Sequence, residues 1–149
     1  MISGPQNIAS IFSALHDGVI SSQLSGKDGL LLVIDAPHLA SRIAPTFTRF
    51  LVCLLGAEDV RFHTWPGEDG GSTHTLAATD EIFRPKLRIL EGNSNDGIIG
   101  VACDHEDADC DYSGGELEFR AELATVSDEA GKFWTLDQLE ALCRDYWDE

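Results

Sequence analysis

The residues best suited to chemistry in this sequence lie in one short acidic segment, Asp104 to Asp111. Its five carboxylates belong to Asp104, Glu106, Asp107, Asp109 and Asp111, and the segment holds no basic residue. Carboxylates this close raise one another's pKa and destabilise an empty loop. Three interpretations stay open: a solvated, mobile hairpin tip, a docking surface for a basic partner, and a divalent cation site.

The cation interpretation depends on the spacing of four acidic residues. Asp107, Asp109 and Asp111 stand at the first, third and fifth positions of a calcium-binding loop, and Glu118 stands at the twelfth. Tyr112 replaces the glycine that the sixth position of such a loop requires, and the following segment is a predicted strand rather than a helix. The sequence therefore predicts at most a weak oxygen-ligand site, which suits Ca²⁺ better than Zn²⁺.

A zinc site at the same segment would use Cys103, His105 and Cys110. These residues supply only three soft ligands at irregular spacing, whereas structural zinc sites use four. Zinc is therefore the weaker of the two metal hypotheses.

An acid–base site is conceivable from His63 and His74 near Asp69. Scattered histidines are more often ordinary surface residues, and the sequence contains no nucleophile elbow, phosphate-binding loop or dinucleotide-binding motif. The pair His105-Glu106 begins a zinc-protease motif, but an aspartate occupies the position of its second histidine. An enzyme with a His/carboxylate site is thus a minor alternative, and no catalytic residue is assigned.

A second acidic contact patch is predicted at the end of the chain. Trp147 lies beside Asp145, Asp148 and Glu149. An exposed tryptophan among polar residues is typical of the anchors of protein–protein interfaces. Trp147 therefore joins the five acids of the 104–111 segment as a candidate partner-binding residue.

Charge excludes two classes of partner. The chain of 149 residues carries a formal net charge of -16. Residues 1–75 hold 4 basic and 7 acidic side chains, a net of -3, whereas residues 76–149 hold 6 and 19, a net of -13. Such a surface repels nucleic acids and anionic membranes. A basic protein is the expected partner.

The expected compartment is the cytoplasm. The N-terminus has no signal-peptide pattern, and the longest apolar run, Phe50 to Leu55, is too short to span a bilayer. The four cysteines form no C-x-x-C pair, and a chain of this length needs no disulfide to be stable. We therefore expect free, buried thiols.

Helical periodicity is clearest near the two ends of the chain. Ile8, Ile11, Phe12 and Leu15 recur on one helical face. Thr135 and Gln138 predict a capping box for a last helix, and residues 37–43 predict a short helical turn. The apolar stripe of the last helix is Leu136, Leu139, Leu142, Cys143 and Tyr146.

Most of the remaining chain shows the two-residue period of strands. A hairpin is expected from 19–24 and 30–34, and Phe50 to Leu55 is apolar on both faces, which predicts a central strand covered on each side. One long strand is predicted over 116–126, and the segment 73–83 is ambiguous. Shorter strands are expected at 60–64, 86–90 and 98–103. In the 116–126 strand, five side chains are expected to face the core: Leu117, Phe119, Ala121, Leu123 and Thr125.

These patterns predict a single α+β domain over residues 1–149. It is built on a largely antiparallel sheet of about seven to eight strands with N- and C-terminal helices. The leading hypothesis is a non-enzymatic cytosolic binding protein whose acidic surface contacts a basic partner, as inhibitors and immunity proteins of nucleases do. A divalent cation or small-ligand binding domain that uses the 104–118 segment is the alternative, ahead of the His/carboxylate enzyme.

Overall fold

Strong two-residue periodicity produces a fold dominated by one antiparallel sheet in the computed structural model, which describes residues 1–67 and 73–148. The eight long strands are β2 (Val19–Gly26), β3 (Gly29–Asp35), β4 (Arg49–Leu55), β5 (Glu58–Thr64), β7 (Leu87–Asn95), β8 (Ile98–Asp104), β9 (Gly114–Arg120) and β10 (Leu123–Ser127). Three two-residue strands extend it: β1 (Ile2–Ser3), β6 (Thr75–Leu76) and β11 (Phe133–Trp134). The predicted α+β class and the antiparallel sheet are confirmed.

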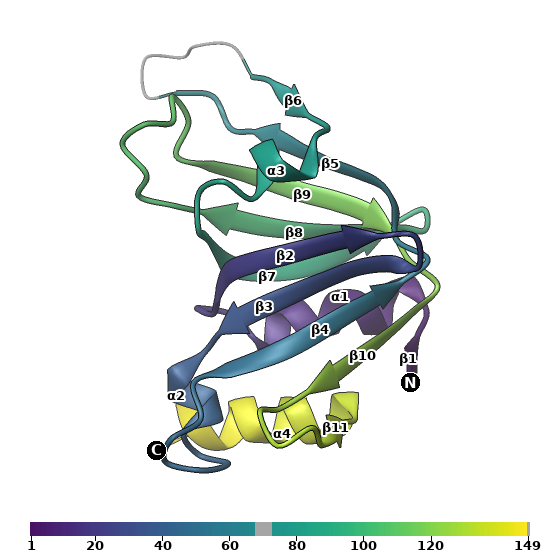
Figure 1. Cartoon of the computed structure of the whole chain (residues 1–149), viewed down its shortest axis with the longest axis vertical. Coiled ribbons are helices and arrows are strands. Elements are labelled where there is room, and N and C mark those ends of the chain that lie inside the picture. The colour runs from purple at the N-terminus through teal and green to yellow at the C-terminus, as the bar shows by residue number, and fades with distance from the viewer. Residues whose placement is uncertain (68–72, 149) are drawn as a thin grey trace.

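The strand order divides the sheet into two regions. The order is β1-β10-β4-β3-β2-β7-β8-β9-β5-β6, and β11 pairs with β10 beside β1. We call β2, β3, β4 and β10 the lower region, because β3, β4 and β10 lie low in Figure 1. Strands β5 to β9 are the upper region, and β5, β6 and β9 lie high in the same view. Strands β2 and β7 join the two regions through only two residue pairs, Val19 with Arg88 and Ile20 with Leu87.

Four helices accompany the sheet in the described part of the chain. They are α1 (Pro5–Ala14), α2 (Pro37–Ala40), α3 (Thr79–Ile82) and α4 (Leu136–Trp147). Ile8, Ile11 and Phe12 of α1, and Leu15 after it, are completely buried, as their spacing predicts. The capping box of α4 is also confirmed, because Gln138 N donates to Thr135 Oγ1 at 3.1 Å and Thr135 N donates to Gln138 Oε1 at 3.0 Å. No described helix is long and apolar enough to cross a bilayer.

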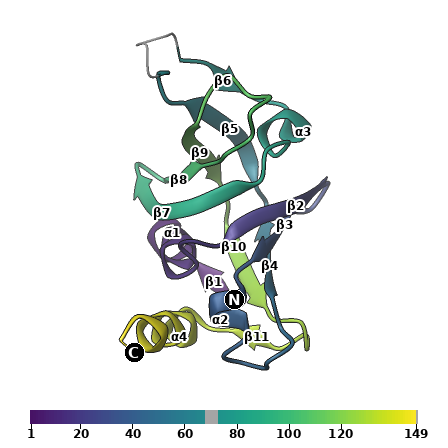
Figure 2. The same cartoon turned by 90° about the vertical axis from the view of Figure 1, so that its left-hand side faces the viewer.

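The prediction that the Phe50–Leu55 strand is covered on both faces is wrong. Phe50, Val52 and Leu54 of β4 are completely buried, but Leu51 is 37% exposed. Figure 2 shows α1, α2 and α4 on one side of β3 and β4, with none of these three helices on the other side. β4 is central in the sheet, between β10 and β3, yet it is covered on one face only.

The predicted strand over 116–126 is in fact two strands. β9 pairs with β5 and β8, whereas β10 pairs with β4 after a break at residues 121–122. Leu117 and Phe119 face the core as predicted, but the break shifts the alternation, so Ala124 and Val126 are buried in β10. Leu123 and Thr125 therefore lie on the opposite face from the one expected.

Candidate functional site

The acidic segment forms the connection between β8 and β9, and its first carboxylate is clamped to β7. Arg88 Nε and Nη2 donate to the two carboxylate oxygens of Asp104 at 2.9 and 2.6 Å. This bidentate ion pair lowers the pKa of Asp104 below its ordinary value and raises the pKa of Arg88. The predicted hairpin connection is therefore present, and one end of it is held firmly against the sheet.

The rest of the connection is ordered by its own backbone. His105 N donates to Ser113 O at 3.0 Å across the base of the loop. Asp109 N donates to Asp107 Oδ1 at 2.9 Å, and Cys110 N donates to Asp107 O at 3.2 Å, which closes a turn at the tip. Asp104 and Asp107 are half-buried by these contacts. Glu106, Asp109 and Asp111 remain exposed.

A stripe of three basic residues faces this acidic connection. Arg84, Lys86 and Arg88 are exposed on one side of an extended segment whose alternate residues, Pro85 and Leu87, are buried. A cavity of about 600 Å³ is lined by residues of both the stripe and the connection. Its lining is Val19, Arg84, Lys86, Arg88, Asp104, His105, Glu106 and Asp107.

Sequence reasoning missed this basic stripe, although a signal for it was present. Basic residues at positions 84, 86 and 88 share one face of an extended chain. The acidic segment itself holds no basic residue. The repulsion among its carboxylates is offset instead by a segment about twenty residues earlier in the chain, through the Arg88–Asp104 ion pair.

The structure does not assemble the four carboxylates of the calcium hypothesis. Glu118 lies on β9, where its Oε1 is 2.7 Å from His63 Nε2 of β5. Four residues of extended chain separate Glu118 from Gly114, a distance of about 13 Å along the strand. Among residues 1–67 and 73–148, no three His, Cys, Asp or Glu side chains are grouped as metal ligands would be.

The three zinc candidates also have separate surroundings, and each has different neighbours. Cys103 is completely buried in β8, and burial raises the pKa of its thiol. His105 packs edge-to-face on Tyr112, with ring centroids 4.9 Å apart. Cys110 Sγ accepts a long hydrogen bond of 3.6 Å from Arg84 Nη2. All four cysteines are free thiols, but only Cys103 is fully buried, so the expectation of burial holds for one of them.

The two histidines of the acid–base hypothesis have different surroundings. His63 lies in a polar row across three strands, with Nδ1 3.0 Å from Thr75 Oγ1 and Nε2 2.7 Å from Glu118 Oε1. His74 instead lines a cavity of about 170 Å³ with Thr64, Leu76, Glu81, Arg84, Asp111 and Tyr112. Asp69 lies outside the described residues.

The Thr75–His63–Glu118 row has the order hydroxyl, imidazole and carboxylate that nucleophilic catalysis uses. However, the side chains of His63 and Glu118 are 44% and 37% exposed, so water competes for every one of these hydrogen bonds. In this structure the row joins β6, β5 and β9 through cross-strand contacts.

Trp147 is the last residue of α4, and Figures 1 and 2 show α4 at the opposite end of the molecule from β5 and β9. Its ring stacks on His16 at a centroid distance of 5.1 Å, and it meets Tyr146 edge-to-face at 5.0 Å. Trp147 is still 51% exposed. The structure therefore does not gather the predicted partner-binding residues into one patch: Trp147 anchors the end of α4, and the acids form the other group.

A cysteine–histidine contact beside Trp147 was not anticipated. Cys143 Sγ lies 3.9 Å from His16 Nδ1. Burial raises the pKa of the Cys143 thiol, which keeps it protonated and unreactive at neutral pH. His16 Nδ1 also bonds to the Ser13 carbonyl oxygen at 2.8 Å, so this imidazole is already engaged by the end of α1.

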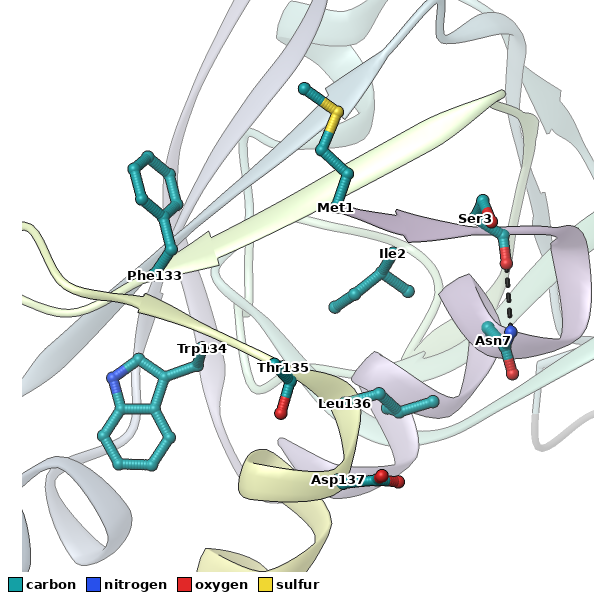
Figure 3. A pocket seen from close by; sticks show the side chains of 9 residues that line it. All are labelled: Met1, Ile2, Ser3, Asn7, Phe133, Trp134, Thr135, Leu136 and Asp137. Carbon is teal, nitrogen blue, oxygen red and sulfur yellow. Dashed lines mark hydrogen bonds between the residues drawn. The ribbon is translucent and has the colours of Figure 1, made fainter.

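A further cavity of about 370 Å³ lies where β1, β11 and the start of α4 meet (Figure 3). The residues that line it are Met1, Ile2, Ser3, Asn7, Phe133, Trp134, Thr135, Leu136 and Asp137. Asn7 Nδ2 donates to Ser3 O at 3.0 Å at one end of it. Asp137 is the one charged side chain among these residues.

The described residues thus present an ordered acidic connection, a basic stripe and an exposed polar row. A comparison of the chain with known protein families, with curated proteins and with solved structures finds no match.

Proposed function

We propose that this chain is a non-enzymatic binding protein whose acidic surface contacts a basic protein partner, in the manner of an inhibitor or immunity protein. The observation that carries the proposal is the ordering of the acidic connection. The Arg88–Asp104 clamp and the turn at Asp107 order the backbone that carries Glu106, Asp109 and Asp111. A partner therefore meets a loop backbone that needs little further ordering, which lowers the entropic cost of binding.

The distribution of charge supports the same proposal. Residues 56–122 contain 16 acidic and 5 basic side chains, a net of -11. This segment begins after β4 and ends before β10, so it forms the region of β5 to β9. A field concentrated in one region steers a basic protein toward it and accelerates association at low salt. The four free thiols agree with the cytoplasm, where we place the protein.

The proposal is tested by affinity capture from native lysate at 50 and 300 mM NaCl. The bait variant carries Glu106→Gln, Asp109→Asn and Asp111→Asn. The wild type is expected to retain a protein of isoelectric point above 9 at low salt. Retention by the variant should fall on the order of 10-fold, because three fixed charges are lost.

The matched control carries Glu58→Gln, Asp80→Asn and Asp96→Asn. These residues are exposed and lie outside the connection, so the control has the same net charge as the variant. It should bind the partner like the wild type. Equal losses in variant and control would show that only overall charge matters, and capture that does not weaken with salt would contradict the proposal.

A further inference from the structure

In the lower region of the sheet, one face is not covered by α1, α2 or α4. This face carries apolar side chains on every long strand. Alternate residues of β3 and β4 are completely or almost completely buried beneath the helices, which leaves the intervening residues on the other face. We call that set the outer apolar face. It consists of Leu24, Leu31, Val33, Leu51, Cys53, Leu55, Leu123 and Phe133.

Strand register makes this face continuous. One row runs from Val33 through Leu51 and Ser127 to Phe133. The next runs from Leu24 through Leu31 and Cys53 to Thr125. A third pairs Leu55 with Leu123. Residues directly opposite on neighbouring strands share a face, so the rows form one patch.

The patch is open to solvent. Leu24 is 67% exposed, Leu51 37% and Phe133 68%, and these are three of the six most exposed large apolar side chains in the described chain. Figure 3 shows Phe133 and Met1 directed to one side of β10, while Trp134 and Ile2 point to the other. Met1, which is 84% exposed, thus extends the patch at its edge.

The size of the patch suits a weak protein–protein contact. Five neighbouring strands at about 4.8 Å and three rows at about 6.8 Å, with side chains at the margins, cover roughly 24 by 20 Å. This outline of about 500 Å² includes the polar residues Thr125 and Ser127 of the rows, and it lies within the range for the largest patch on a typical monomer. It also approaches the roughly 600 Å² per partner at the lower bound of specific interfaces.

Charge argues against a basic protein as the partner of this face. Residues 1–55, which include β2, β3 and β4, contain 3 basic and 3 acidic side chains, a net of zero, so the whole charge of -16 lies in residues 56–149. None of the eight residues of the outer apolar face is charged. Asp35 and Arg49 lie in the next row of the same face, with Arg49 Nε 4.0 Å from Asp35 Oδ1. The eight residues themselves offer a basic partner no ion pair, whereas a second copy would meet an equally apolar surface.

We propose that two copies of this chain form a dimer through the outer apolar face. A two-fold axis through the patch stacks the two sheets face to face about 10 Å apart and brings Leu51 and Cys53 close to their counterparts. The dimer leaves both acidic connections free, so it is independent of the binding function proposed above.

Sedimentation equilibrium of the purified wild type tests the dimer at 5–200 μM protein. We expect twice the monomer mass of 16.2 kDa at high concentration. Raising NaCl from 50 to 300 mM should strengthen the dimer, because salt screens the repulsion between two like-charged copies. Salt has the opposite effect on a complex with a basic partner, so the two proposals fail separately.

Leu51→Lys places two cations at the centre of the interface and should give a monomer at every concentration. Asn95→Lys adds the same charge at an exposed end of β7 and should dimerise like the wild type. If Leu51→Lys does not fold, as judged by circular dichroism, Leu24→Lys with Phe133→Lys replaces it. Both of these side chains are two-thirds exposed and contribute little to the core.

Alkylation of the wild type by iodoacetamide gives a measurement that needs no variant. The rate at Cys53 should fall at least 5-fold between 5 and 200 μM protein, while the rate at the half-buried Cys110 stays constant. A wild type that remains monomeric at 200 μM, a Leu51→Lys variant that still dimerises, or a Cys53 rate independent of concentration would each overturn the proposal. The first of these results would assign the face to a different protein.

Discussion

At the scale of single residues, Asp128 shows how this acidic chain stabilises a buried carboxylate. Asp128 is 3% exposed and lies just after β10. Burial alone raises the pKa of its carboxyl, but three N–H donors outweigh that effect and hold the pKa below its ordinary value. The donors are Trp134 Nε1 at 2.9 Å, Ala130 N at 2.9 Å and Lys132 N at 3.1 Å. One side chain thus fixes the turn between β10 and β11.

Replacing Asp128 by Asn should lower the free energy of unfolding by about 2 kcal/mol at pH 7, because an amide cannot accept from all three donors and loses the charge. Urea unfolding followed by tryptophan fluorescence measures the change. Asp96→Asn, in the exposed turn between β7 and β8, is the matched control and should cost little.

The pH dependence of the same pair of variants gives a second check on this expectation. A carboxyl whose folded pKa is depressed contributes stability above its unfolded pKa of about 3.9, and that contribution is lost as the pH falls through the folded pKa. The wild type should therefore lose stability below about pH 4 more steeply than Asp128→Asn. Parallel curves for the two proteins would contradict the assigned role of the carboxylate.

At the scale of elements, the close approach of α1 to β7 depends on one glycine. A Cβ on Gly92 would lie 2.1 Å from the carbonyl oxygen of Ala9 and 3.2 Å from Cβ of Phe12. Ser13 Oγ also bonds to both Gly92 N and Gly92 O, at 3.0 and 3.2 Å. Helix backbone and strand backbone are thus in direct contact here, and Phe12 reaches Phe119 of β9 with ring centroids 5.9 Å apart.

Gly92→Ala should therefore destabilise the protein by about 3 kcal/mol, since the clash is with backbone and the helix must shift. Thermal unfolding by calorimetry measures the loss. Gly26→Ala is the control, because nothing lies within 4 Å of its added Cβ. Similar midpoints for the two variants would show that α1 does not pack on β7 in this way.

At the scale of the whole molecule, uncompensated charge and apolar surface occupy different regions of the sheet. The region built from residues 56–122 has a net charge of -11, and the region that carries the outer apolar face is made mainly from the neutral segment 1–55. Repulsion within the acidic region opposes folding, whereas the apolar face favours association. The two proposed contacts therefore use separate parts of one sheet.

Self-repulsion predicts that salt stabilises the fold itself. The melting midpoint of the monomeric Leu51→Lys variant should rise by roughly 3 °C between 10 and 300 mM NaCl, which corresponds to about 1 kcal/mol of relieved repulsion. Using this variant separates the effect from dimer formation. A midpoint that falls with salt would mean that attractive ion pairs such as Arg88–Asp104 outweigh the repulsion.

The sequence by itself determined the elements whose signals are local. The buried stripe of α1, the capping box of α4 and the hairpin of β2 and β3 follow from spacings of two to four residues, which neighbouring side chains fix without help from the rest of the chain. The acidic connection was also located correctly between two strands, because composition marks loops.

Tertiary structure decided which faces are covered and which charges meet. The break at residues 121–122 changes which side chains of β10 face the core, since that strand pairs with β4 and not with the neighbours of β9. Arg88 reaches Asp104 only because β7 and β8 are paired, and Glu118 meets His63 only because β9 and β5 are. A strand that is apolar on both faces predicts burial on both, but only the placement of the helices shows that one face of β4 stays open.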